Sequence, residues 1–260
     1  MAIVAIIPAR FASTRLPGKP LSLIAGRPMI QWVYERARLA RTVTRAVVAT
    51  DDDRIRDAVL SFGGEAVMTS PTHASGTDRL AEAAAALDAD VVVNVQGDEP
   101  LLDPAAIDAV VEALIGDQGA DIATATVACS SAEEMLSSDV VKVVTDNRGH
   151  ALYFSRAPIP HMRRTPPDHH ASAREALACG LALRHLGLYA YRKEALIRFA
   201  SLPASPLERA ECLEQLRALH HGLRIRVVKL DSAGGPAVDT LADLERVRAI
   251  LASTSQEERT

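Results

Sequence analysis

The chain alternates between short apolar runs and longer segments of helical period. Continuous runs of Val, Ile and Ala are typical of strands that are buried on both faces, and apolar residues spaced three or four apart are typical of helices that cover a sheet. The alternation therefore predicts an α/β fold with a mostly parallel sheet and helices on both faces. Strands are expected near 2–8, 46–50, 65–68, 90–95, 121–127 and 141–145, and helices near 28–40, 52–61, 77–87, 104–115 and 131–136.

The second half of the sequence has a different pattern. Tyr153, Phe154 and the run HLGLYAY indicate strands, residues 158–170 are rich in Pro and His, and a helix is predicted over about 206–220. We therefore expect a mixed sheet with an inserted lobe in this half. Because no break in composition marks a boundary, we expect a single domain over residues 1–252, followed by a polar tail at 253–260.

Composition narrows the class of protein. A hydrophobic content of 48% over 260 residues is enough for a large core, and a net charge of −4 argues against nucleic acid as a partner. The longest apolar run near the N-terminus, residues 2–9, is far shorter than the roughly 20 residues of a membrane span, so no membrane insertion is expected. Three widely spaced cysteines form no C-x-x-C pair, which fits a reducing, cytoplasmic location.

The first expected strand opens into a basic loop that contains Arg10, Ser13, Arg15 and Lys19. Guanidinium, ammonium and hydroxyl groups are suited to a triphosphate, and ligands of open α/β sheets collect at the carboxyl ends of strands. A solvated surface loop is the alternative. No G-x-x-x-x-G-K-[ST] or G-x-G-x-x-G motif is present, which excludes a P-loop ATPase and a dinucleotide-binding dehydrogenase.

An acidic cluster follows another expected strand, in VVVNVQGDEP. Mg²⁺ takes oxygen ligands, and Gly97 would let the backbone turn tightly so that Asp98 points at a ligand. Capping of the next helix explains Asp103 but not Asp98. Asp239 ends a later apolar step just before a helix, and from the residues alone a cap is the better interpretation of it than a metal ligand.

Several ordered motifs together carry a family resemblance that spans almost the whole chain. They are IIPARFASTRLPGKPL, VVATDD, SGTDRLAE, VVNVQGDEP, VKVV, ALYFSRAPIP, RHLGLYAYR, SPLERAECLEQLR and VDTLADLERVR. In these segments the chain resembles the 3-deoxy-manno-octulosonate cytidylyltransferases. The resemblance implies a nucleotide-diphospho-sugar transferase type of fold and a homodimer. It also implies a reaction of CTP with the sugar acid Kdo that gives CMP-Kdo and pyrophosphate for lipopolysaccharide biosynthesis.

The same resemblance implies roles for individual residues. Arg10, Ser13, Arg15 and Lys19 match the triphosphate loop, with Lys19 and Arg10 stabilising charge on the departing pyrophosphate. The segment Ser75, Gly76, Thr77 matches the stretch beside the cytidine, and Asp98 and Asp239 match the carboxylates that hold Mg²⁺, which makes Asp239 a ligand rather than a cap. The residues that match the Kdo pocket are Gln96, Arg156, Arg163, His185, Tyr189, Glu214 and Gln215.

Residues 161–182 depart from the pattern of the family, which makes Arg163 the least secure of these assignments. The pairs His169-His170 and His220-His221 are assigned to the surface rather than to a metal, because adjacent histidines point apart on a strand and lie poorly on one helix face.

Three alternatives stay open. The acceptor can be an 8-amino analogue of Kdo or a sialic acid, since the discriminating contacts lie in the second half of the chain. A nucleotidyltransferase acting on a sugar phosphate or polyol phosphate would need a further cationic pocket. A nucleotide-binding protein without catalysis would bind nucleotide and release no pyrophosphate.

Overall fold

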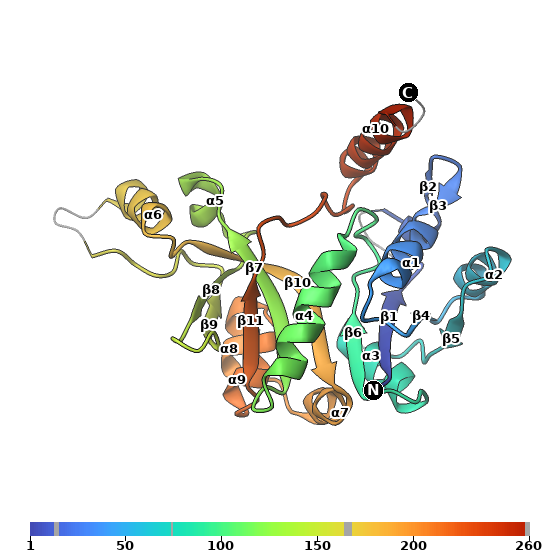
Figure 1. Ribbon diagram of the computed structural model, residues 1–260, viewed down its shortest axis with the longest axis horizontal. Helices are drawn as coiled ribbons and strands as arrows, with labels where there is room; N and C mark the ends of the chain where they lie inside the picture. Colours follow the sequence, from blue (N-terminus) through green and yellow to red (C-terminus); the bar gives the residue numbers. More distant parts are fainter. Residues whose placement is uncertain (13–15, 74, 164–167, 258–260) are drawn as a thin grey trace. The chain divides into compact units, whose positions relative to one another are not determined.

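The structure, a computed structural model, describes residues 1–12, 16–73, 75–163 and 168–257, with side chains described as far as residue 253. The chain forms two compact units. Unit 1 consists of Met1–Asp108 and Gly234–Thr260, and unit 2 consists of Ala109–Ala233. The division falls inside helix α4 (Pro104–Gly116). Figure 1 shows the elements of each unit in the colours of the sequence.

Unit 1 is built on a parallel sheet whose strands are β1 (Ile3–Ala9), β4 (Arg45–Thr50), β5 (Ala66–Met68) and β6 (Val91–Asn94). Their order in the sheet is β6-β1-β4-β5. Helices α1 (Met29–Leu39), α2 (Asp53–Ser61) and α3 (Gly76–Ala85) pack against these strands. Strand β1 lies inside the sheet and is contacted by α1 and α3, so it is buried along nearly its whole length, as its uninterrupted apolar sequence predicts. A 3-10 helix (Lys19–Leu21) and the short hairpin β2 (Leu23–Ile24) and β3 (Arg27–Pro28) lead into α1.

The last helix of the chain, α10 (Leu241–Glu257), belongs to unit 1. Its apolar face and the segment before it form a buried cluster with residues near the start of the chain. The cluster consists of Ile24, Met29, Val238, Leu244, Val247 and Leu251. Arg248 also donates from Nε to the backbone oxygen of Leu23 at 2.9 Å. This packing brings the segment around residue 239 beside the loop that follows β1.

Unit 2 has a mixed sheet. Its strands are β7 (Ile122–Ala128), β8 (Lys142–Thr145), β9 (Ala151–Ser155), β10 (Leu183–Arg192) and β11 (Ile225–Lys229). Strand β10 is antiparallel to both β7 and β8, β11 is parallel to β7, and β9 is antiparallel to β8. The helices are α5 (Ala132–Leu136), α6 (His169–Ala178), α7 (Lys193–Ser201), α8 (Pro206–Glu211) and α9 (Gln215–His220).

Every strand and helix predicted before residue 146 is present, with bounds within two residues of the expected ones. Tyr153, Phe154 and the run HLGLYAY lie in strands, as expected. A mixed, mostly parallel sheet with helices is thus confirmed. The inserted lobe and the single domain over 1–252 stay predictions.

The helix predicted over 206–220 is wrong in one respect, because two short helices occupy this range. They are separated at Cys212, which has a left-handed backbone with φ 53° and cannot continue a right-handed helix. Helices α6 and α7 and strand β11 were not foreseen, and α10 extends to residue 257, into the expected polar tail. None of the described helices is long and apolar enough to cross a membrane.

Candidate active site

Lys19 lies between the two carboxylates that the sequence proposed as metal ligands. Its Nζ donates to Asp98 Oδ2 at 2.8 Å, to the backbone oxygen of Val238 at 2.9 Å and to Asp239 Oδ1 at 3.3 Å. The Lys19 side chain is only 15% exposed, so this ammonium is compensated by its own site rather than by water. Three residues from distant parts of the sequence therefore form one charged cluster in unit 1.

The structure separates Asp239 from the cap of the following helix. Thr240 is the capping residue of α10, because its Oγ1 accepts from the backbone N–H of Asp243 at 3.2 Å. Asp243 Oδ2 in turn accepts from Thr240 N at 2.9 Å, which completes a capping box. The interpretation of Asp239 as a cap, drawn from the residues alone, is therefore wrong, and its carboxylate faces Lys19 instead. Asp103 does cap α4 and accepts from Ala105 N at 2.9 Å.

Asp98 is held by the backbone around it. Its carbonyl accepts from Val238 N at 2.8 Å, which joins the loop after β6 to the segment before α10. Gly97 is needed here for close approach, because a Cβ at this position would lie 2.9 Å from the Pro8 oxygen. The expected tight turn is also present, because Glu99 N donates to the Gln96 oxygen at 3.3 Å across Gly97 and Asp98. Desolvation, and secondarily the charge of Asp98, raises the pKa of the neighbouring Glu99 to about 7.

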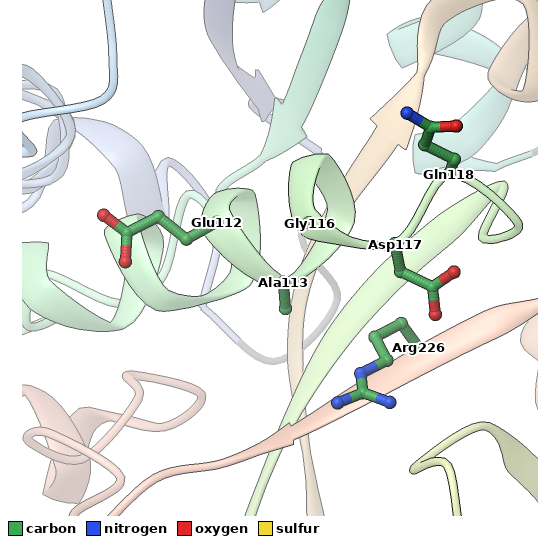
Figure 2. Close-up of a pocket in the computed structure, with 6 residues that line it drawn as sticks. All are labelled: Glu112, Ala113, Gly116, Asp117, Gln118 and Arg226. Atoms are coloured by element: carbon green, nitrogen blue, oxygen red, sulfur yellow. The ribbon is translucent and has the colours of Figure 1, made fainter.

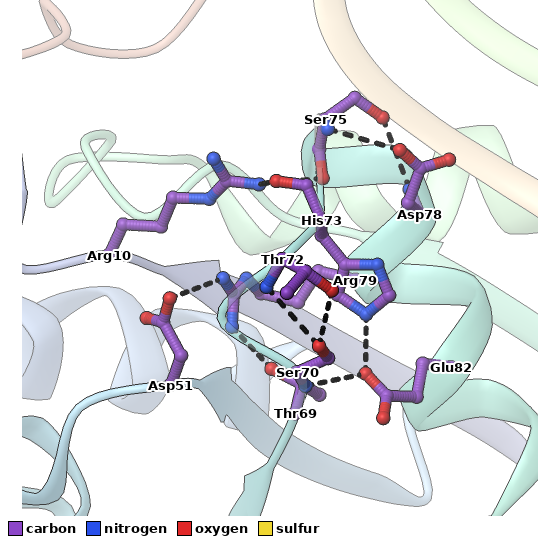
Figure 3. A network of polar contacts seen from close by, with 10 residues as sticks. All are labelled: Arg10, Asp51, Thr69, Ser70, Thr72, His73, Ser75, Asp78, Arg79 and Glu82. Carbon is purple, nitrogen blue, oxygen red and sulfur yellow. Dashed lines mark hydrogen bonds and ion pairs between the residues drawn. The ribbon is translucent and has the colours of Figure 1, made fainter.

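Arg10 fastens the end of β1 to the loop before α3 (Figure 3). Its Nη2 donates to the backbone oxygens of His73 at 2.8 Å and Ser75 at 2.9 Å. Ser75 is the N-cap of α3, and its hydroxyl accepts from Asp78 N at 3.2 Å while Asp78 Oδ2 accepts from Ser75 N at 3.1 Å. The structure thus brings Arg10 and the Ser75 segment together, as the site prediction requires.

A buried arginine supports this region. Arg79 on α3 is fully buried; its Nη2 donates to Asp51 Oδ2 at 2.9 Å and its Nη1 to the Thr69 hydroxyl (Figure 3). Asp51 and Arg10 both line a cavity of about 290 Å³ in unit 1. Sequence reasoning assigned no role to Arg79 or Asp51, although both lie in motifs that carried the resemblance. A charged residue at an apolar-face position of a helix was the signal for Arg79.

The structure also shows where the other predicted site residues of unit 1 lie. Ser13 and Arg15 lie outside the described residues. Gly76 is the first residue of α3, and Thr77 follows it with only 5% of its surface exposed. Gln96 lies in the loop after β6, and its backbone oxygen accepts from Glu99 N at 3.3 Å.

In unit 2, β10 places His185 and Tyr189 among aromatic rings. The His185 ring lies edge-on to Phe154 at 5.0 Å and 5.3 Å from Tyr189, measured between ring centroids. Tyr189 stacks on Tyr191 at 5.7 Å. Desolvation lowers the pKa of His185 to about 3, and desolvation together with the nearby Tyr191 and Glu214 raises the pKa of Tyr189. Both groups are therefore neutral at pH 7.

The hydrogen bonds around His185 indicate its tautomer. The Thr124 hydroxyl has one proton, and the backbone oxygen of Leu188 lies 2.8 Å from it and can only accept. Thr124 Oγ1 then accepts from His185 Nε2, which is 2.9 Å away. With its proton on Nε2, His185 has an acceptor at Nδ1.

Glu214 and Gln215 lie at the start of α9, where Glu214 is the N-cap residue and Gln215 the first helical residue. Gln215 is buried, with 8% of its surface exposed. Arg156 follows β9, where Nε donates to the Glu211 oxygen at 2.8 Å and Nη1 to the Ser138 oxygen at 3.0 Å. Arg163 is exposed, next to residues outside the description.

The predicted pairs of histidines lie on helix ends. His169 and His170 begin α6 and are exposed, rather than lying in a loop, while His220 ends α9 and His221 follows it.

A larger cavity of about 550 Å³ lies in unit 2 (Figure 2). Its lining residues come from α4, the turn after it and β11. The lining consists of Glu112, Ala113, Gly116, Asp117, Gln118 and Arg226. None of these is a predicted site residue, so size alone does not identify the active site.

The donor set near Lys19 fits a divalent cation that is shared with a phosphate. No group of three or more His, Cys, Asp or Glu side chains able to hold a metal is present among the described residues. Asp98 and Asp239 supply oxygen ligands and already bind one cation, the Lys19 ammonium. Mg²⁺ is usually bound by one or two carboxylates together with substrate phosphates, and this pair matches that requirement.

Comparison with known proteins identifies the family of this chain. A family model described as "Cytidylyltransferase" matches residues 4–225. The 3-deoxy-manno-octulosonate cytidylyltransferase of Syntrophotalea carbinolica is 55% identical over 96% of this chain and 99% of its own length. The protein of the same name from Trichlorobacter lovleyi is 52% identical over 95% of this chain and 98% of its own length.

Solved structures give the same result. A CMP:2-keto-3-deoxy-manno-octonic acid synthetase, solved in complex with CTP, aligns with a TM-score of 0.88 and 44% identity over 98% of this chain and 100% of that one. The 4-diphosphocytidyl-2C-methyl-D-erythritol synthase of Anaerococcus prevotii, at 14% identity, aligns with a TM-score of 0.60 over 96% of this chain and 98% of its own, and shares the fold alone. With full-length relatives at this level of identity, the chain belongs to the 3-deoxy-manno-octulosonate cytidylyltransferase family.

Proposed function

We propose that this protein transfers a cytidylyl group from CTP to Kdo and releases pyrophosphate, and that CMP-Kdo is its product. The observation that carries the proposal is the cluster of Lys19, Asp98 and Asp239 at the carboxyl ends of the parallel strands of unit 1. The names of the full-length relatives support the nucleotide and the acceptor. A product of this kind feeds lipopolysaccharide biosynthesis.

The chemistry is an in-line displacement at the α-phosphorus. The anomeric hydroxyl oxygen of the sugar forms a bond to the α-phosphorus, the bond from that phosphorus to the bridging oxygen breaks, pyrophosphate leaves, and the hydroxyl proton passes to water. Lys19 and Arg10, with Ser13 and Arg15 in the same loop, bind the triphosphate and stabilise charge on the departing pyrophosphate. Ser75, Gly76 and Thr77 bind the cytidine.

Asp98 and Asp239 hold Mg²⁺ in this proposal. The ion, when bound, supplies positive charge to the phosphates and lowers the pKa of a coordinated hydroxyl. Lys19 contacts both carboxylates in the structure. A triphosphate that draws the Lys19 ammonium toward itself would leave Asp98 and Asp239 available to the metal ion. Nucleotide binding and metal binding are thereby linked through the Lys19 side chain.

The residues proposed to bind the sugar acid are Gln96 of unit 1 and six residues of unit 2. Arg156 and Arg163 pair with its carboxylate, and His185, Tyr189, Glu214 and Gln215 bind its hydroxyls. His185 is not the general base, because a group with a pKa of about 3 is too weak a base to deprotonate a sugar hydroxyl at neutral pH. Its Nδ1 instead accepts a hydrogen bond. We also propose that the protein is a cytoplasmic homodimer, which sedimentation of the purified protein tests.

The experiment is to measure pyrophosphate release with CTP and Mg²⁺ in parallel reactions containing Kdo, 8-amino-Kdo, a sialic acid, a sugar phosphate or no acceptor. Release with Kdo that is lost with UTP, with ATP or after addition of EDTA supports the proposal. Faster release with another sugar acid changes the acceptor and leaves the reaction class. CTP binding without release from any acceptor rejects the enzyme in favour of a binding protein.

The metal assignment has its own test. We expect Asp98→Asn to abolish turnover while the circular dichroism spectrum and melting temperature stay near those of the wild type, since the Lys19 ammonium keeps Asp239 and the Val238 oxygen as acceptors. Retained turnover in the folded variant would remove Asp98 from the ligand set.

A further inference from the structure

Lys142 is a fully buried lysine at the start of β8 in unit 2. Its sequence, DVVKVV, places a cation inside an apolar strand, where a charged group is unfavourable unless each of its protons is bound. The ammonium donates to three backbone oxygens, those of Ser137 at 2.7 Å, Val140 at 2.5 Å and Arg156 at 2.5 Å. Three donors thus meet three acceptors, and the contact joins the turn after α5 to the residue that follows β9.

The Arg156 side chain also contacts the turn after α5. Its Nη1 donates to the oxygen of Ser138, which lies between two of the Lys142 acceptors in the sequence. Its Nε donates to the Glu211 backbone oxygen at 2.8 Å. Both acceptors are neutral carbonyl groups, so these two hydrogen bonds orient the guanidinium without an ion pair.

Glu211 fixes the backbone from the other side. Its Oε2 accepts from the backbone N–H of Arg156 at 2.8 Å, and its Oε1 accepts from the Ser155 hydroxyl at 2.7 Å. Both the backbone and the guanidinium of Arg156 are therefore held, the former by Lys142 and Glu211 and the latter by two carbonyls. Among the described residues, Arg156 Nη2 has no hydrogen-bond partner and remains available to an anion.

We propose that Lys142 and Glu211 are positioning residues that hold Arg156 in place for the carboxylate of the sugar acid. The inference rests on the proposed function, in which Arg156 binds that carboxylate. Neither residue touches the substrate in this account. A guanidinium that is already oriented loses less side-chain entropy when the anion binds, so the two residues act on the affinity for the acceptor and not for the nucleotide.

The first test compares Lys142→Met and Glu211→Gln with Lys229→Met, which removes an exposed lysine of the same unit. We expect KM for Kdo to rise by about tenfold in the first two variants, the loss associated with a charge-assisted hydrogen bond, while KM for CTP stays at the wild-type value. Lys229→Met should match the wild type in both constants. Equal KM for Kdo in the wild type and in a folded Glu211→Gln protein overturns the proposal.

The second test is a double-mutant cycle with Arg156→Gln. If Glu211 and Lys142 act through Arg156, their substitutions add nothing to KM for Kdo once Arg156 has been replaced. Additive effects would instead show a general structural role and would overturn the proposal. Should Lys142→Met fail to fold, Glu211→Gln is near-isosteric, and its cycle with Arg156→Gln decides the question alone.

Different results would overturn the proposed function and the positioning role of Lys142 and Glu211. A wild-type protein that releases no pyrophosphate with any sugar acid overturns the proposed function and the role of Arg156 with it. An active wild type whose Arg156→Gln variant keeps its KM for Kdo overturns only the assignment of Arg156 and its positioning residues.

Discussion

The candidate site residues of the two units differ in charge and in how that charge is compensated. In unit 1 the site residues are charged and compensate one another: Lys19 with Asp98 and Asp239, and Arg79 with Asp51. In unit 2 His185 and Tyr189 are neutral at pH 7, desolvation lowers the pKa of His185, and Arg156 is oriented by carbonyl oxygens. A polyanion with a metal ion is suited to the first arrangement, and a singly charged polyhydroxy acid is suited to the second.

The largest effect is expected from Lys19→Met, which tests whether the charged cluster of unit 1 acts in catalysis. We expect kcat to fall by about three orders of magnitude, because an ammonium that stabilises transition-state charge is removed. Pyrophosphate release at saturating CTP and Kdo measures the change, and Lys229→Met in unit 2 is the matched control. A Lys19→Met protein within about tenfold of the wild type would show that its charge does not act in the transition state.

Asp239 and Thr240 are adjacent, but we expect their substitutions to affect different properties, catalysis for Asp239 and stability for Thr240. Asp239→Asn is expected to lower kcat by at least about a hundredfold, because a ligand for the metal ion is lost. Thr240→Ala should lower the free energy of unfolding by about 1 kcal/mol through loss of the helix cap, with kcat retained. Urea unfolding and steady-state rates of both variants test this, and the reverse pattern would return Asp239 to a capping role.

Titration of His185 is a test of burial in unit 2. Its pKa is about 3 in the folded protein and 6.5 in the unfolded chain, so the unfolded state binds more protons between these values. Stability therefore falls as the pH drops below about 6.5, by about 2 kcal/mol at pH 5 from this group. His185→Gln should remove this contribution in urea unfolding at a series of pH values, and His220→Gln, on the exposed end of α9, should not. Parallel curves for His185→Gln and the wild type would contradict the assigned burial.

The smallest expected effects come from exchanging one arginine in each unit. Arg10→Gln should raise KM for CTP, and Arg156→Gln should raise KM for Kdo, each by about tenfold and each with little effect on the other substrate. Initial rates over a grid of both substrate concentrations give the two constants. An increase in both constants for either variant would mean that the division of labour between the units is incomplete.

The parts of the fold that the sequence predicts are those with local causes. The strands of unit 1 were found because each is a short apolar run bounded by polar residues, and the site residues at their ends follow from the parallel arrangement. Helix α6 was missed because Pro and His precede it in a stretch without helical period. The break at Cys212 was missed because nothing in ERAECLEQ marks a left-handed residue.

The site shows the same limit. Arg10, Lys19 and Asp98 were identified from chemistry placed after strands, whereas the role of Asp239 depended on which neighbour caps α10, a choice made by packing. Lys142 and Glu211 were not singled out, since their partners are backbone oxygens and N–H groups that no sequence pattern displays. Long-range contacts with the backbone are the part of a site that single-sequence reasoning misses.

The contribution of α10 to unit 1 also sets the order in which the protein can mature during synthesis. Residues 1–108 leave the ribosome long before residues 234–251, yet the buried cluster that contains Ile24 and Met29 is completed by Leu244, Val247 and Leu251. At about 5–20 residues per second the intervening unit takes several seconds to translate, and for that time the nascent first segment exposes apolar surface. Until then the segment also lacks Asp239, one of the two carboxylates that contact Lys19.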